Sequence, residues 1–214
     1  MTGRKNSQKI LALLEKEYPD IKGTALMYNN TLELLVATIL SAQCTDERVN
    51  DVTRILFNKY RTANDYARAD LEDLEEIIKP TGFYHRKAKF IKEVAEKLIE
   101  DFSSEIPQSI EKLTELPGVA RKTANVVLSN AFHVDQGIAV DTHVMRLSKR
   151  LGFTEEQNRE KIEKDLMDLF PRDEWFEVSN LLIAHGRNVC TARKPKCEEC
   201  IVNEICPSAF SFDR

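Results

Sequence analysis

The sequence predicts an all-α protein with short loops. Its apolar residues recur at intervals of three and four along most of the chain, which is typical of the buried face of a helix. No stretch alternates apolar and polar residues for long enough to indicate a strand. The chain has 214 residues, of which 42% are apolar and 31% charged, and this balance excludes a disordered protein. No apolar run approaches the roughly 20 residues that cross a membrane.

The few Gly and Pro residues separate ten expected helices. The segment 32–40 is apolar on almost every side, which indicates a helix buried at the centre of its domain. Thr154 and Gln157 match the capping-box pattern and are expected to open the ninth helix. The other expected helices are 10–18 (stopped by Pro19), 49–60, 71–78 (ended by Pro80), 88–102, 110–116, 123–132, 144–151 (closed by Gly152) and 175–184.

Charge is distributed unevenly along the chain. The formal net charge is −4, which alone does not suggest a nucleic-acid partner. Binding depends on local patches, however, and basic residues gather in several short segments. These segments are Arg86–Lys89, Arg121–Lys122, Arg146–Arg150 and Arg187–Lys196. If the fold brings the first, second and fourth to one side, they would grip a phosphate backbone.

Four of the five cysteines lie in a pattern typical of a metal centre. Cys190, Cys197, Cys200 and Cys206 are spaced Cys-x6-Cys-x2-Cys-x5-Cys, and Pro207 follows, as in ferredoxin-type cluster runs. Zinc sites with four cysteines usually have two Cys-x2-Cys pairs, and only one occurs here. Disulfides fit poorly, because the chain shows no secretory signal and is long enough to fold without them. The spacing therefore favours an iron–sulfur cluster and leaves zinc and disulfides open.

The loop within the cysteine pattern is strongly basic. It carries Arg193, Lys194 and Lys196, and Arg187 lies just before it. Such a loop is either a solvated surface or a contact with phosphate groups.

The segment 116–124 predicts a hairpin between two helices. Pro117 ends the first helix, and Gly118 permits a tight turn. The next helix then begins with unpaired backbone N–H groups, which attract an anion such as a DNA phosphate. Lys122 falls in its first turn, where the helix dipole and the charge of Arg121 disfavour a protonated amine. A neutral amine there could attack a sugar C1′, although a surface lysine that contacts phosphate is the simpler interpretation.

Asp141 precedes the eighth helix and is expected to be its N-cap. A carboxylate near a nucleophilic amine could also take its proton and stabilise a developing oxocarbenium ion. Both roles are compatible with the sequence.

Together these motifs resemble the endonuclease III family of DNA glycosylases. The resemblance covers nearly the whole chain and also includes the segments Leu40–Gln43, Gly82–Tyr84, Val140–Val144 and His185–Arg187. It implies two helical domains. Residues 25–136 would form a six-helix barrel that contains the helix–hairpin–helix motif, and residues 1–24 with 137–214 would form a domain that holds a [4Fe-4S] cluster on the four cysteines.

The resemblance also implies the chemistry. Lys122 matches the family's nucleophilic lysine and Asp141 its catalytic aspartate, so the protein would excise oxidised pyrimidines and cleave 3′ to the abasic site by β-elimination through a Schiff base. Gln43 matches the residue that fills the gap left by the extruded base. Phe83 stands where the family often has an aliphatic wedge, and Ala120 where the hairpin often has a second glycine. The implied DNA contacts are Gln43, Phe83, Gly118, Ala120, Arg121, Arg187, Arg193, Lys194 and Lys196.

The expected partner is double-stranded DNA that contains damaged pyrimidines or abasic sites, bound by a cytoplasmic, monomeric protein without a membrane segment. Two other functions are compatible with parts of the pattern. A monofunctional mismatch or adenine glycosylase of the same superfamily would lack a lysine at the position of Lys122. A non-catalytic iron–sulfur module that binds DNA or transfers electrons would need neither Lys122 nor Asp141.

Overall fold

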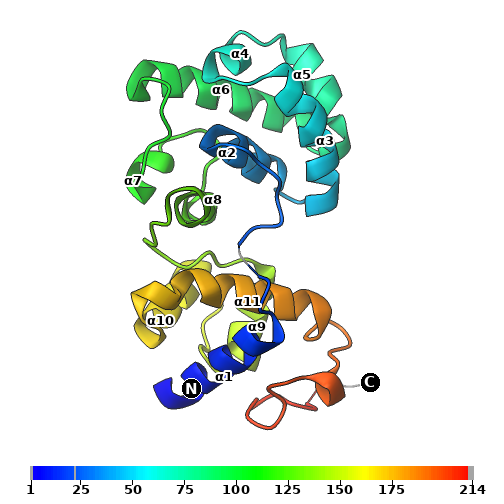
Figure 1. Ribbon diagram of the computed structural model, residues 1–214, viewed down its shortest axis with the longest axis vertical. Coiled ribbons are helices and arrows are strands. Elements are labelled where there is room, and N and C mark those ends of the chain that lie inside the picture. The colour runs from blue at the N-terminus through cyan, green and yellow to red at the C-terminus, as the bar shows by residue number, and fades with distance from the viewer. Residues whose placement is uncertain (1, 22, 212–214) are drawn as a thin grey trace. The chain divides into compact units, whose positions relative to one another are not determined.

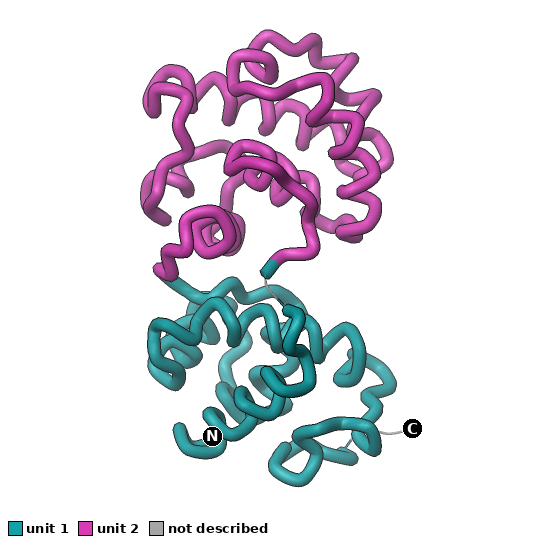
Figure 2. The backbone as a smooth tube through the Cα atoms, in the orientation of Figure 1, with its two compact units in different colours: residues 1–23, 137–214 teal, residues 24–136 magenta. Residues whose placement is uncertain are grey.

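The computed structural model describes residues 2–21 and 23–211, and every regular element in these ranges is a helix (Figure 1). The chain divides into two compact units (Figure 2). Unit 1 comprises Met1–Gly23 and Gly137–Arg214, and unit 2 comprises Thr24–Gln136. In the described ranges, no helix is both long and apolar enough to cross a membrane.

Unit 2 is built around α2, the apolar helix that the sequence analysis places at the centre. Leu34, Leu35 and Leu40 of α2 are fully buried. The helix packs against α3, α6 and α8, while α6 also covers α4 and α5. The short α4 is not marked by the apolar pattern, because only two of its residues are buried. In chain order the elements are α2 (Thr31–Leu40), α3 (Asp46–Lys59), α4 (Ala63–Ala67), α5 (Leu71–Ile78), the 3₁₀ turn η1 (Lys79–Thr81), α6 (Tyr84–Phe102), α7 (Ile110–Leu113), α8 (Arg121–Val127) and the π-helical turn η2 (Leu128–Phe132).

Side-chain caps fix where these helices begin. Asn30 caps α2 by accepting a hydrogen bond from the backbone N–H of Glu33, and Asp70 caps α5 in the same manner. Thr62 and Asp65 form a reciprocal capping box at α4. The caps satisfy backbone donors that the helices themselves leave unpaired.

Unit 1 joins the two ends of the chain around one core. Ile10 and Leu14 of α1 are fully buried in the same cluster as Val144, Leu147 and Leu182. Helix α11 packs against α1 and α9. The elements are α1 (Arg4–Glu17), α9 (Thr142–Arg150), α10 (Arg159–Leu169), η3 (Arg172–Glu174), α11 (Trp175–Asn188) and η4 (Cys197–Glu199).

The capping box expected at Thr154 and Gln157 is wrong. The ninth predicted helix, α10, begins at Arg159, and Asn158 is its N-cap. Thr154 is instead buried, where its hydroxyl donates to Asp165 and accepts from the backbone N–H of Glu156. The hydroxyl therefore closes a local turn and ties it to α10, rather than capping a helix.

Candidate functional site

The hairpin between α7 and α8 presents Lys122 to solvent. Gly118 occupies the turn with a φ of 75°, a conformation that a residue without a Cβ adopts readily. Val119 is buried, and its backbone N–H donates to the carbonyl oxygen of Leu116 at 3.1 Å. Lys122 lies in the first turn of α8 and is exposed. The turn thus holds an amine at an accessible helix start.

The same helix start suits an anion. Ala120 is the N-cap residue of α8, and its methyl group cannot accept a hydrogen bond from the helix. The positive end of the helix dipole and the exposed Arg121 lie at this point. A phosphate oxygen could therefore bind the first backbone N–H groups of α8.

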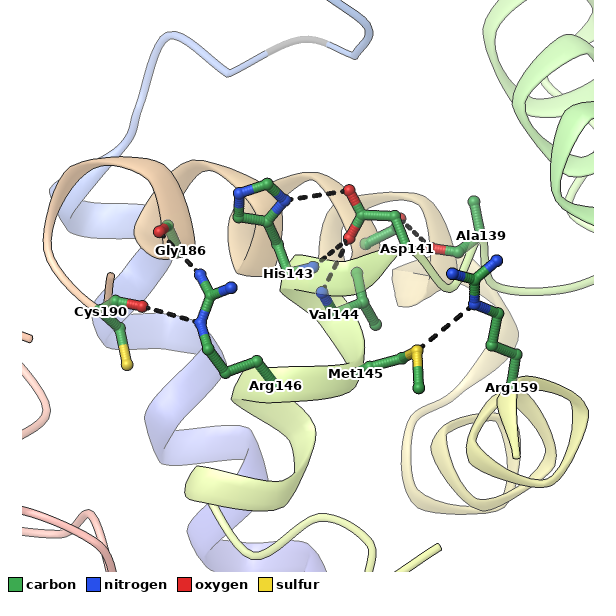
Figure 3. A network of polar contacts seen from close by, with 10 residues as sticks. Ala139, Asp141, His143, Val144, Met145, Arg146, Arg159, Gly186 and Cys190 are labelled. Carbon is green, nitrogen blue, oxygen red and sulfur yellow. Dashed lines mark hydrogen bonds and ion pairs between the residues drawn. The ribbon is translucent and has the colours of Figure 1, made fainter. Parts of the chain in front are cut away.

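Asp141 is the N-cap of α9, as predicted. Its Oδ1 accepts hydrogen bonds from the backbone N–H groups of His143 at 2.7 Å and Val144 at 2.9 Å. Its Oδ2 lies 3.2 Å from Nδ1 of His143 (Figure 3). Only 15% of the Asp141 side chain is exposed. These contacts fix the direction of the carboxylate.

Helix α9 also holds the cysteine segment. Arg146 donates to the carbonyl oxygens of Gly186 at 2.9 Å and Cys190 at 3.2 Å (Figure 3). Arg150 donates to the carbonyl oxygens of Thr191 at 2.7 Å and Ala192 at 2.9 Å. Burial, with the nearby charge of Arg150, lowers the pKa of Arg146. This basic pair from the sequence therefore has an internal structural role.

The four clustered cysteines line one cavity in unit 1. Cys190, Cys197, Cys200 and Cys206 are free thiols that line the same small pocket. Nη1 of Arg150 lies 3.3 Å from the Sγ of Cys190. Four thiols that line one pocket match the donor set of an iron–sulfur cubane.

His185 supports this cavity from α11. Its Nε2 lies 3.3 Å from the Sγ of Cys200, and its Nδ1 lies 3.0 Å from the hydroxyl of Tyr18. Burial lowers the pKa of His185 to about 4, so the ring is neutral near pH 7. Burial also raises the pKa of Cys200 and Cys206, so metal binding, which needs thiolates, would release protons.

The basic loop of the cysteine segment is exposed. Arg193, Lys194 and Lys196 all face solvent, and the amine of Lys196 lies 3.7 Å from a carboxylate oxygen of Glu199. Arg187 is exposed at the end of α11. The segment is closed on itself, since the backbone N–H of Lys196 donates to a carbonyl oxygen at the loop's other end. A folded loop with several cations is suited to phosphate contacts.

Gln43 and Phe83 both have left-handed backbones. Their φ values are 55° and 50°, although neither is a glycine, and both side chains are exposed, Phe83 to 66%. Residues held in this region are strained and cluster at functional sites.

The sequence interpretation of the nearby basic cluster Arg86–Lys89 needs one correction. Lys87 is only 4% exposed and cannot contact DNA, because the helical turn directs it into unit 2.

Comparison with known proteins gives consistent relationships. Residues 36–172 match the HhH-GPD superfamily of base excision DNA repair proteins, and residues 190–206 match the iron–sulfur binding domain of endonuclease III. The chain is 52% identical over 206 residues to endonuclease III of Synechocystis sp., covering 96% of this chain and 94% of that protein. It is 47% identical over 190 residues to endonuclease III of Bacillus subtilis, covering 88% and 86%.

Solved structures show the same relationship. A trapped covalent intermediate between endonuclease III and DNA superimposes with a TM-score of 0.94 at 42% identity, covering 99% of each chain. A thermostable thymine-DNA glycosylase shares the fold, with a TM-score of 0.87 at 21% identity.

Proposed function

Because the chain belongs to the endonuclease III family, it is a DNA glycosylase and AP lyase with a [4Fe-4S] cluster, and we propose that it excises oxidised pyrimidines through Lys122. The observation that carries the residue assignment is the exposed amine of Lys122 in the first turn of α8. A lyase needs such an amine, because strand cleavage proceeds through an imine.

In the proposed reaction, neutral Lys122 attacks C1′ of the damaged nucleotide. The bond between C1′ and the base breaks, and its electron pair leaves with the base, which takes up a proton. The amine then loses a proton, and the C1′–O4′ bond breaks as the imine forms between Lys122 and C1′; O4′ keeps the electron pair of that bond and takes up a proton. Loss of a proton from C2′ breaks the C3′–O bond and releases the 3′ phosphate. The strand is thereby cleaved without an oxidant or reductant.

Asp141 assists this reaction without forming the covalent bond. Its carboxylate is held by two backbone N–H groups and by His143, so its direction is fixed before the substrate binds. An oriented carboxylate can accept the proton of the lysine and stabilise positive charge at C1′. The short side chain and its partners leave it little freedom to turn away.

The proposed DNA contacts form two groups, one to the phosphate backbone of the DNA and one to its base stack. The start of α8, with Gly118, Ala120 and Arg121, would bind one phosphate group. Further phosphates would meet the exposed side chains of Arg187, Arg193, Lys194 and Lys196. A base inside a duplex must be extruded before C1′ is accessible, and Gln43 and Phe83 would occupy the space that it leaves.

Cys190, Cys197, Cys200 and Cys206 would hold the cluster. When bound, the cluster supplies a rigid cross-link of the segment 190–206, because four protein thiolates complete its ligation. The cross-linked segment would then keep Arg193 and its basic neighbours in a fixed loop.

We also propose that the protein acts as a monomer on DNA inside the cell. One chain carries the amine, the carboxylate and the basic segments. Its five free thiols suit a reducing compartment.

The test is borohydride trapping on a duplex that contains an oxidised pyrimidine. Lys122→Gln should abolish the trapped protein–DNA adduct and strand cleavage, while DNA binding is largely retained, since one cation is lost. Lys112→Gln is a matched control, because it removes an exposed cation from the same hairpin. Trapping of Lys122→Gln at the wild-type yield would rule out Lys122 as the nucleophile.

Asp141→Asn separates the role of the carboxylate as the N-cap of α9 from its role in the reaction. Asparagine caps a helix about as well as aspartate, so stability should change little. Base release should slow, while imine formation at a preformed abasic site should persist at a reduced rate. Equal rates of base release in the variant and the wild type would show that the carboxylate only caps α9.

A further inference from the structure

Lys87 is a buried lysine that the reaction does not use. It lies on the first turns of α6 and is 4% exposed. Its amine donates to the carbonyl oxygens of Leu40 at 2.8 Å and Thr81 at 2.9 Å. Burial lowers the pKa of this amine. Burying an amine is unfavourable unless it is hydrogen-bonded. The two acceptors therefore show which parts of the backbone Lys87 stabilises.

The two acceptors are the last residues of the helical elements that precede the left-handed positions. Leu40 ends α2 and is followed, three residues later, by Gln43 with a φ of 55°. Thr81 ends η1 and is followed, two residues later, by Phe83 with a φ of 50°. The amine of Lys87 therefore bonds to two short segments, 40–43 and 81–83. Because both carbonyl oxygens lie within 2.9 Å of the same nitrogen, the two segments are fixed to each other as well as to α6.

We infer that Lys87 is a positioning residue that holds Gln43 and Phe83 as one unit for insertion into the DNA base stack. The inference rests on the proposed function, in which these two side chains occupy the space of the extruded base. Left-handed backbones persist only where the surroundings over-determine them, and the amine of Lys87 supplies that constraint from inside unit 2. Without it, the two segments could relax independently and would no longer oppose return of the base.

The inference separates extrusion of the base from chemistry. Extrusion is costly in a paired duplex and unnecessary in a single strand. Loss of Lys87 should therefore impair excision of an oxidised pyrimidine from a paired duplex, and spare the imine reaction at an abasic site in a single strand. A residue that merely stabilised unit 2 would affect both reactions alike.

The experiment compares Lys87→Met with Lys92→Met. Lys92 is also on α6, and its amine also bonds two carbonyl oxygens, those of Ala67 and Ala69 at 2.6 and 2.8 Å. The control thus removes the same chemistry from the same helix, at carbonyls of the last residue of α4 and of the turn that follows it. We expect Lys87→Met to lower kcat/KM on the paired lesion about tenfold or more, because extrusion of the base contributes a large part of the free-energy cost of that reaction. Single-strand trapping should stay within about twofold of the wild type, and Lys92→Met should change the ratio of the two activities by less than about twofold.

A second readout follows extrusion directly. A 2-aminopurine placed opposite the lesion becomes more fluorescent when it loses its stacking partner. The wild type and Lys92→Met should increase this signal on binding, and Lys87→Met should not. Equal losses of Lys87→Met on paired and single-stranded substrates, or an unchanged fluorescence increase, would overturn the inference.

A third measurement does not depend on the folding of Lys87→Met. In otherwise wild-type protein, Gln43→Ala and Phe83→Ala should be non-additive on the paired lesion, because side chains held as one unit fail together. Additive effects would contradict the inference. If the wild type itself neither releases the base nor forms an adduct, the proposed function fails instead, which is a separate outcome.

Discussion

Replacement of Gly118 by alanine tests the close packing of the hairpin. Gly118 has a φ of 75°, and its Cα faces the ring of Phe90 on α6. A Cβ at this position would lie 2.5 Å from Cδ2 and 2.8 Å from Cγ of that ring. Real Cβ atoms do not approach carbon so closely, so either the ring or the hairpin must move. The hairpin that positions Lys122 therefore depends on the absence of one methyl group.

Two contributions set the size of the effect. A left-handed backbone costs a residue with a Cβ about 1–2 kcal/mol. Forcing an extra carbon into a packed contact costs about 1–3 kcal/mol more. Gly118→Ala should therefore lower the free energy of unfolding by about 2–5 kcal/mol.

A Phe90→Ala background isolates the first contribution. Without the ring, a Cβ at position 118 no longer meets the Phe90 side chain, so Gly118→Ala should there cost only about 1–2 kcal/mol.

The assay is urea unfolding followed by circular dichroism, with the free energy extrapolated to water. If Gly118→Ala is as destabilising in the Phe90→Ala background as in the wild type, the steric argument is refuted. An unchanged free energy in both backgrounds would refute the conformational argument as well.

Three further outcomes follow from the site. Cys197→Ser removes one of four proposed cluster ligands, so iron per chain and visible absorbance should fall and proteases should cut the segment 190–206 more readily; full iron content would contradict the assignment. Arg193→Ala should reduce the slope of log affinity against log salt by about 1, measured by DNA titration at several salt concentrations, whereas an unchanged slope would mean that Arg193 does not contact a phosphate. Burial lowers the pKa of Lys87, so between that pKa and 10.5 the unfolded chain binds more protons than the folded one. The unfolding free energy of the wild type, minus that of Lys87→Met, should therefore rise with pH through this window, and a difference that falls would contradict the argument.

Local signals in the sequence determined most of the helices and the helix cap at Asp141. Continuous apolar character marked α2 as central, and the carboxylate before a helical pattern marked Asp141 as an N-cap. These features depend on neighbours within a few residues, so periodicity and capping rules detect them. The cysteine spacing favoured an iron–sulfur centre for the same reason, because the ligands lie close together in the chain.

Helix starts and short helices were less predictable. Helix α6 begins at Tyr84 rather than near residue 88, because its first turn is mostly polar and carries no apolar signal. Thr154 carries a capping pattern, but a hydrogen bond to Asp165 on α10 draws it inward. Where a side chain has two competing hydrogen-bond partners, tertiary packing rather than helix propensity decides which one it bonds.

The role of Lys87 could be decided only by the tertiary structure. In the sequence it is one cation in the basic segment Arg86–Lys89, indistinguishable from its neighbours. In the structure its amine bonds the carbonyl oxygen of Leu40, which is 47 residues away. The sequence determined that these cations occur together, whereas packing decided which of them faces solvent and which is buried. Burial and long-range hydrogen bonds arise from the whole fold, so no local pattern in the sequence encodes them.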